Sequence, residues 1–107
     1  MAEAGEAERF HASLAADFDT AGPLRWGFLL DGASEGQVGP LIDAAGRLGF
    51  TEVEPLPDEE REGQFTLSLS EVRAHTARSF AARLAAVQEL AVREGLVVAD
   101  YTAGLPE

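Results

Sequence analysis

Leu24-Arg-Trp-Gly-Phe-Leu-Leu-Asp31 is the stretch that decides the fold, because large and small side chains alternate along it. A period of two is typical of a β-strand, whose successive side chains point to opposite faces. The larger residues share one face: Leu24, Trp26, Phe28 and Leu30. The other face carries Arg25, Gly27, Leu29 and Asp31. At about 1.5–3 kcal/mol for each fully buried large side chain, the first face predicts a central core strand.

After this strand, apolar spacing predicts two helices and three further strands. The first helix repeats its apolar residues three or four positions apart and ends at a left-handed glycine cap, Gly49. The clearest alternation elsewhere begins near Gln64, where hydroxyl side chains separate Phe65, Leu67 and Leu69. The remaining predicted elements are strands over Phe50–Leu56 and Leu96–Tyr101 and a helix over Thr76–Glu94 that Gly95 can cap.

A further helix is predicted before the first strand, over Ala2–Phe18. Its apolar residues recur at helical spacing and line one face: Ala7, Phe10, Leu14 and Phe18. Gly22-Pro23 then ends the helix, because neither residue continues it readily.

The order strand–helix–strand, strand–helix–strand between Leu24 and Tyr101 predicts an α+β fold of the split βαβ, or ferredoxin-like, type (βαββαβ). Right-handed crossovers would place both helices on one face of the sheet, with the first and third strands at its centre. A chain of 107 residues is expected to form one domain. Residues 1–22 would be an additional N-terminal helix and linker, and residues 23–102 the core.

The face of the sheet turned away from those helices is predicted to carry small residues at its centre, with one leucine among them: Gly27, Leu29, Thr66 and Ser68. Such a surface can be packed closely by the N-terminal helix, by a second copy in a homodimer or by a protein partner. We expect the N-terminal helix there, through Phe10 and Leu14, because its apolar face has to be buried somewhere.

The composition excludes several classes of function. A net charge of −11 opposes direct binding to nucleic acid or to an anionic membrane. All eight basic residues are arginine, so mechanisms that need a lysine, such as phosphate-loop nucleotide binding and Schiff-base chemistry, are excluded. The absence of cysteine excludes disulfides and thiolate chemistry. The acidic charge fits either a basic protein partner or solubility alone.

A cytoplasmic location is expected from two features of the sequence. Met1–Arg9 is acidic and lacks the basic start and apolar middle of a signal peptide. No apolar run approaches the roughly 20 residues that a membrane span needs.

Metal and cofactor sites are not predicted. His11 and His75 have no histidine or cysteine partners at ligand spacing, and we expect His11 at the surface of the first helix. Asp17–Gly22 resembles the opening of a calcium loop, but the twelfth position is Phe28 instead of a bidentate glutamate.

One motif resembles the active site of a hydrolase. Gly32-Ala-Ser-Glu-Gly36 matches the G-x-S-x-G nucleophile elbow, and Asp58 and His75 follow in the order acid, histidine. An α/β-hydrolase needs a larger sheet than this chain can form, so a small hydrolase using Ser34 is the remote alternative. We expect Ser34 to start a helix, with Gln37 at capping-box spacing.

Four segments carry a resemblance to a known family. They are Trp26-Gly-Phe-Leu-Leu, Leu41-Ile-Asp-Ala-Ala-Gly-Arg-Leu-Gly-Phe50, Phe65-Thr-Leu-Ser-Leu and Leu90-Ala-Val-Arg-Glu-Gly95. The chain resembles the regulator of ribonuclease activity B family, the ribonuclease E inhibitor proteins. The resemblance implies a ferredoxin-like fold that binds a ribonuclease and performs no catalysis. Where the family carries Tyr-Asp-Gly-Trp, this chain reads Ala99-Asp-Tyr-Thr102, and the aspartate alone keeps its place.

The leading hypothesis is therefore a non-catalytic interaction module that regulates an RNA-processing ribonuclease by binding it. The candidate contact residues are an acidic run and the remnant of the family motif: Asp58, Glu59, Glu60, Glu62, Asp100 and Tyr101. The alternative is a dimeric, small-molecule-binding regulatory domain of ferredoxin-like type. No cofactor is expected in either case.

Overall fold

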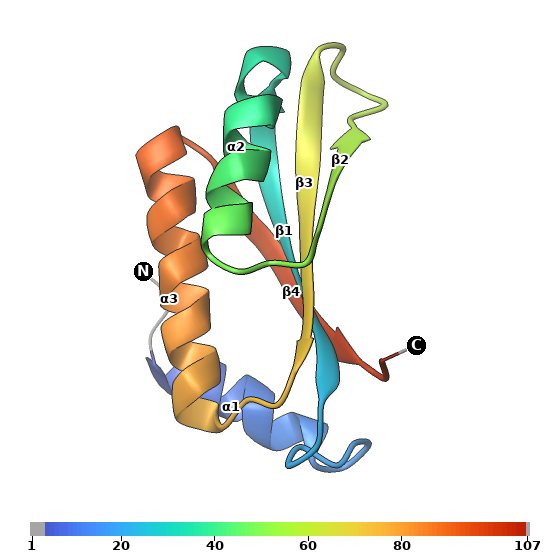
Figure 1. Ribbon diagram of the computed structural model, residues 1–107, viewed down its shortest axis with the longest axis vertical. Helices are drawn as coiled ribbons and strands as arrows, with labels where there is room; N and C mark the ends of the chain where they lie inside the picture. The colour runs from blue at the N-terminus through green and yellow to red at the C-terminus, as the bar shows by residue number, and fades with distance from the viewer. Residues whose placement is uncertain (1–3, 107) are drawn as a thin grey trace.

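The computed structural model describes residues 4–106 and contains a four-stranded antiparallel sheet with three helices. The strands lie in the order β2-β3-β1-β4 (Figure 1). The architecture is α+β and is compatible with the ferredoxin-like class. In chain order the elements are α1 (Ala4–Leu14), β1 (Leu24–Ser34), α2 (Glu35–Arg47), β2 (Glu52–Pro57), β3 (Gln64–Arg73), α3 (Ala77–Glu94) and β4 (Val97–Gly104).

The centre of the sheet is the pair β1 and β3, as the alternation predicted. Their register runs from Leu24 opposite Arg73 to Ser34 opposite Gln64. The four large residues of β1 are buried, and they share the core with two leucines of β3, Leu67 and Leu69. The opposite face of both strands holds the smaller side chains, so the period of two decides which face of the sheet is apolar.

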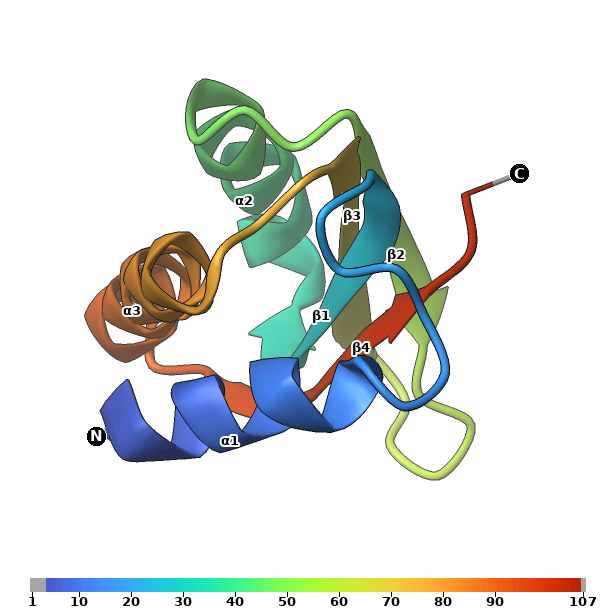
Figure 2. The same cartoon turned by 90° about the horizontal axis from the view of Figure 1, so that it is seen from below.

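Helices α2 and α3 cover the same face of the sheet (Figure 2). The chain enters α2 at Ser34, whose backbone N–H donates to the Gln37 side chain, so the helix begins before Pro40 and contains it. Gly49 follows α2 with a φ of +96°, and Gly95 caps α3 with a φ of +75°. These are the two positions at which the sequence predicted left-handed glycine caps.

Helix α1 does not lie on the small-residue face, so the expectation for it is wrong. It packs beside α3 and reaches the edge strand β4, on the core side of the sheet (Figure 2). The Phe10 ring lies 5.3 Å from that of Phe80 and 4.7 Å from that of Tyr101. The apolar face of α1 is therefore buried against other aromatic residues, which satisfies its need for burial without the open face.

Several boundaries also differ from those expected. Helix α1 ends at Leu14, four residues before Phe18, and its predicted start at Ala2 lies outside the described residues. Strand β1 continues to Ser34 and β4 to Gly104, so residues predicted as loop or tail are paired. For these two strands, a neighbouring strand supplies backbone partners that local sequence does not reveal.

The position of α1 predicts different costs for two truncations. Phe10→Ala should lower the free energy of unfolding by about 2 kcal/mol, because it removes a ring packed against Phe80 and Tyr101. Leu29→Ala, on the uncovered face, should cost about 1 kcal/mol or less. Urea denaturation followed by Trp26 fluorescence measures both, with Val92→Ala, on an exposed position of α3, as the control. A larger cost for Leu29→Ala than for Phe10→Ala would contradict this placement of α1.

Candidate functional site

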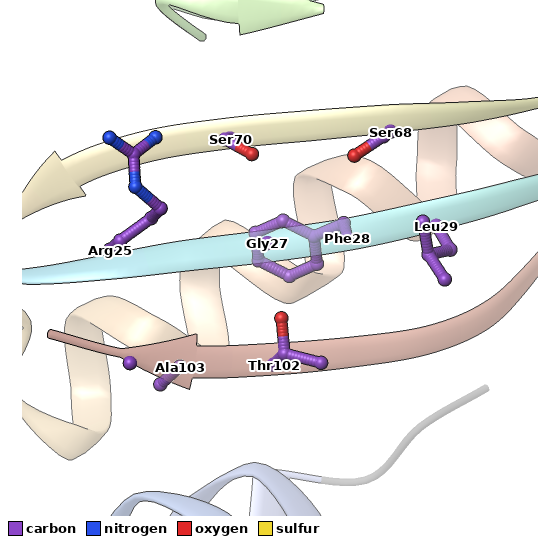
Figure 3. Close-up of a pocket in the computed structure, with 9 residues that line it drawn as sticks. Arg25, Gly27, Phe28, Leu29, Ser68, Ser70, Thr102 and Ala103 are labelled. Carbon is purple, nitrogen blue, oxygen red and sulfur yellow. The ribbon is translucent and has the colours of Figure 1, made fainter. Parts of the chain in front are cut away.

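One face of the sheet is covered by none of the described helices, and this open face is the first candidate site. On this face β1 presents Arg25, Gly27 and Leu29. The strands on either side of it, β3 and β4, present Ser68, Ser70 and Thr102 (Figure 3). These residues line a shallow depression of about 270 Å³ centred on Gly27. A Cβ atom at Gly27 would lie 2.9 Å from Thr102 Oγ1, so glycine leaves room for the Thr102 side chain.

Carboxylates surround the centre of the open face. The register places four of them on this side of the sheet: Asp31, Glu52, Glu54 and Asp100. Arg25 is the only basic residue at a strand position of this face, and it forms an ion pair with Glu52. Within residues 4–106 the sheet strands therefore give this face three negative charges more than positive ones, four carboxylates against one guanidinium.

Exposed apolar side chains also gather on the open face. Of the five large hydrophobic residues that are exposed among residues 4–106, three sit at its strand positions: Leu56, Val72 and Val97. Leu56 and Val97 belong to one row across the sheet, because Thr66 and Asp31 lie between them in register. The row is apolar only at its two ends, which lie on the edge strands β2 and β4, and its centre is polar.

The sequence-predicted contact residues do not form one surface. Asp58, Glu59, Glu60 and Glu62 lie in the connection between β2 and β3, at the end of the molecule opposite α1 (Figure 1). This connection is ordered by its own contacts, because Asp58 N–H donates to the Gln64 carbonyl and Glu60 N–H donates to the Asp58 carboxylate. Asp100 lies on the open face, midway along β4.

Tyr101 faces the helical side of the sheet, opposite to Asp100. Its register partner is the buried Phe28, and its hydroxyl donates to Glu6 of α1 at 2.8 Å. Burial raises the pKa of the Tyr101 hydroxyl, and the hydrogen bond and charge of Glu6 raise it further. The role of Tyr101 in this structure is to hold α1, whereas Asp100 is available to a partner.

The predicted triad is not assembled. Ser34 is opposite Gln64 and lies near Asp58, but His75 follows the far end of β3. The 10 residues of β3 lie between them, which is about 30 Å of strand. Ser34 caps α2, where its hydroxyl donates to Gln37 Oε1 at 3.1 Å. The G-x-S-x-G sequence thus marks the junction between a strand and a helix.

A buried ionic cluster lies where β3 meets α3. Glu71 is 3% exposed and His75 4% exposed, although both carry polar side chains. Arg83 of α3 binds both carboxylate oxygens of Glu71, at 2.8 and 3.0 Å. Nε2 of His75 lies 3.2 Å from the same carboxylate, and Nδ1 lies 2.8 Å from the hydroxyl of Ser79.

The charge state of Glu71 follows from its neighbours. Burial by itself raises the pKa of this carboxyl, but the hydrogen bonds from His75 and Arg83 and the charges of Arg83 and Arg73 outweigh burial. The net result is a pKa below its ordinary value. Glu71 is therefore an ionised, bidentate partner for arginine in a site closed to water.

Sequence reasoning missed this cluster, although one signal was present. Glu71 occupies the inward position of β3 that follows Leu67 and Leu69, so the period of two predicts its burial. A buried carboxylate requires a cationic partner, and an arginine on the facing helix was a candidate. Sequence does not say which of the arginines reaches it.

His11, expected at the surface of the first helix, is only partly exposed. Its ring stacks on Trp26, with ring centroids 6.0 Å apart, and its Nε2 donates to the His75 carbonyl at 2.6 Å. Within residues 4–106 no group of three or more His, Cys, Asp or Glu side chains is arranged to hold a metal ion. In the same range no helix is long and apolar enough to cross a membrane.

Comparisons with known proteins identify no relative: no protein-family model, curated protein or solved structure matches the chain.

Glu71→Gln should lower the free energy of unfolding by about 3 kcal/mol at neutral pH, because it leaves the buried Arg83 without its counter-charge. The folded-state pKa of Glu71 lies below its ordinary value of 4.5, so the stabilisation is complete above that pH. It is lost as the pH falls through the folded-state pKa. The difference between wild type and variant should therefore shrink below pH 4.5, as measured by urea denaturation. The exposed Glu54→Gln is the control, and a difference that persists in acid would contradict this sign.

Tyr101→Phe should cost up to about 1 kcal/mol at neutral pH through loss of the hydrogen bond to Glu6. The folded-state pKa of Tyr101 is raised above 10.0, so its stabilisation is present below that pH and lost as the pH rises through the folded-state value. Guanidinium denaturation above and below pH 10.0 should show the two proteins converging in alkali. A gap that widens with pH would refute this account.

Proposed function

We propose that the chain is a protein-binding module of the split βαβ type, and that its binding surface, the open face of the sheet, acts by recognition and not by catalysis. The observation that carries the proposal is a sheet face that no described helix covers and that holds three exposed apolar side chains among acidic residues. A sheet face of this kind loses exposed apolar area when a partner packs on it. The fold thus leaves one of its two broad surfaces for recognition.

The charge of the open face favours a basic partner. Asp31, Glu54 and Asp100 are carboxylates at its strand positions, and the whole chain carries a net charge of −11. Complementary charge steers association and selects partners, whereas a second acidic copy of this chain would be repelled. We therefore propose a basic protein in preference to a homodimer.

An RNA-processing ribonuclease is the proposed partner. Enzymes that bind RNA carry basic surfaces, because the phosphate backbone supplies much of their binding energy. The resemblance of the segments around Trp26, Leu41, Phe65 and Leu90 to ribonuclease E inhibitors supports the same class. Asp100 lies on the open face and is the one residue of the family motif that this chain keeps in place.

The depression at Gly27 gives less support to a small-molecule ligand. Its volume of about 270 Å³ is below the roughly 300–1,000 Å³ of most ligand pockets. A flat surface with small side chains at its centre suits a protein partner better than a metabolite. Regulatory metabolite binding is therefore the alternative, and it predicts an increase in the thermal stability of the protein with ligand.

The test is a binding titration between the purified protein and the purified ribonuclease of the same organism, by calorimetry at two salt concentrations. Leu29→Glu should weaken binding at least tenfold, which is about 1.4 kcal/mol, because it places a charge at the centre of the proposed interface. Asp100→Asn should weaken binding less and reduce its dependence on salt. Val92→Glu, on an exposed position of α3, is the matched control and should bind like wild type.

Two results would overturn the proposal. The first is wild-type binding by a folded Leu29→Glu protein. The second is loss of binding when Glu59 and Glu60 are neutralised while Leu29→Glu still binds, since the site would then be the acidic connection. A dimeric mass in sedimentation equilibrium, lost in Leu29→Glu, would also refute a basic partner as the occupant of this face.

A further inference from the structure

The buried cluster contains an acid, an imidazole and a hydroxyl in series. His75 uses Nδ1 to contact Ser79 Oγ at 2.8 Å and Nε2 to contact Glu71 Oε2 at 3.2 Å. Such a series activates a serine, because the imidazole takes the hydroxyl proton while the carboxylate orients and stabilises the ring. His75 thus has a serine and an acid, but neither of the two that its sequence motif suggested.

The hydrogen bonds fix the direction in which each proton points. Glu71 is a carboxylate bound by two N–H groups of Arg83, so Nε2 of His75 donates to it. Nδ1 of the neutral ring is then an acceptor. The Thr76 N–H donates to Ser79 Oγ at 2.9 Å, which leaves the hydroxyl proton free. Of its two acceptors, Nδ1 at 2.8 Å is nearer than the Thr76 carbonyl at 3.3 Å.

The surroundings of Ser79 can receive a small substrate. A wide, open groove of about 400 Å³ runs beside it, and Arg73 and Arg83 line it together with Ser79. Its walls include three small residues, Ala74, Ala82 and Ala86. Ser79 is exposed to this groove, whereas His75 is 4% exposed, so the base is shielded from water behind its serine.

The start of α3 also provides a place for negative charge. Ser79 is the third residue of this helix, whose first backbone N–H groups have no intrahelical acceptor. The N–H groups of Ala77 and Arg78 therefore lie at the positive end of the helix, in the two residues that precede Ser79. Donors in this position stabilise an oxyanion as it forms.

We propose that Ser79 is a nucleophile that accepts the acyl group of a small carboxylic ester bound in this groove. Ser79 Oγ would attack the carbonyl carbon as its proton passes to His75 Nδ1. The carbon–oxygen bond to the alcohol then breaks, and the alcohol leaves with that proton. Water attacks the acyl-serine with His75 as its base, which releases the carboxylic acid and restores the hydroxyl. Glu71 is a positioning residue in this sequence.

The activity would be independent of the binding surface proposed above. Ser79 lies at the start of α3, on the helical side of the sheet, and the open face lies on the other side (Figure 2). Loss of partner binding in Leu29→Glu would therefore leave the reactivity of Ser79 intact. The two proposals can fail separately.

The test treats the whole purified protein with an alkyl fluorophosphonate, which forms a serine–phosphorus bond and releases fluoride. Intact-mass spectrometry should show a single adduct, and peptide mapping should place it on Ser79. His75→Gln should slow labelling at least 100-fold, because general-base assistance contributes roughly that much. Ser34→Ala, which removes the serine of the G-x-S-x-G sequence, should label like wild type.

An internal control keeps the test decisive if His75→Gln fails to fold. Ser13 of α1 is also exposed, and its hydroxyl donates to the Phe10 carbonyl at 2.6 Å, without a base. Labelling of wild-type Ser79 much faster than Ser13 supports the proposal. Equal rates at the two serines, no adduct on Ser79, or an unchanged rate in folded His75→Gln would each overturn it. A p-nitrophenyl ester then tests turnover, which Ser79→Ala should abolish.

Discussion

Trp26 is the residue on which the arrangement of the helical layer depends. It is fully buried, and its indole N–H must find an acceptor, which is the Arg73 carbonyl at the end of β3, at 2.8 Å. Phe80 of α3 packs on one part of the indole with a centroid distance of 5.0 Å, and His11 of α1 stacks on it. One side chain therefore joins β1, the end of β3, α1 and α3. Because α1 finds its place on this aromatic cluster, it is not available to cover the sheet.

The two faces of the sheet consequently have different roles. The helical face buries the large residues of β1 and β3, and α1 closes the side of this layer that borders β4. The other face exposes glycine, hydroxyl side chains and carboxylates to solvent. Leu56 and Val97 are exposed on its two edge strands, β2 and β4. If α1 lay on the open face instead, that face would not be accessible to a partner. The aromatic contacts of α1 thus leave open the face that we propose as the binding surface.

The second polar feature of the fold is the cluster around Glu71. An isolated buried carboxylate would be costly, but Arg83 satisfies both of its oxygens and also lies over the Phe50 ring, 4.2 Å from its centroid. The same carboxylate orients His75, which in turn faces Ser79. In the proposal for Ser79, stability and reactivity rest on one set of contacts, since the ion pair that anchors α3 to β3 also orients His75.

The sequence by itself determined the elements that depend on local pattern. Alternation in β1 and β3, glycine caps at Gly49 and Gly95 and the order of strands and helices all follow from neighbours within a few residues. It also predicted the small centre of the open face and the inward side of β3. Tertiary structure alone decided where α1 lies, how far β4 pairs and what surrounds His75. Those outcomes rest on contacts such as that of His11 with His75, 64 residues apart, and no local preference specifies which distant side chain completes a pair.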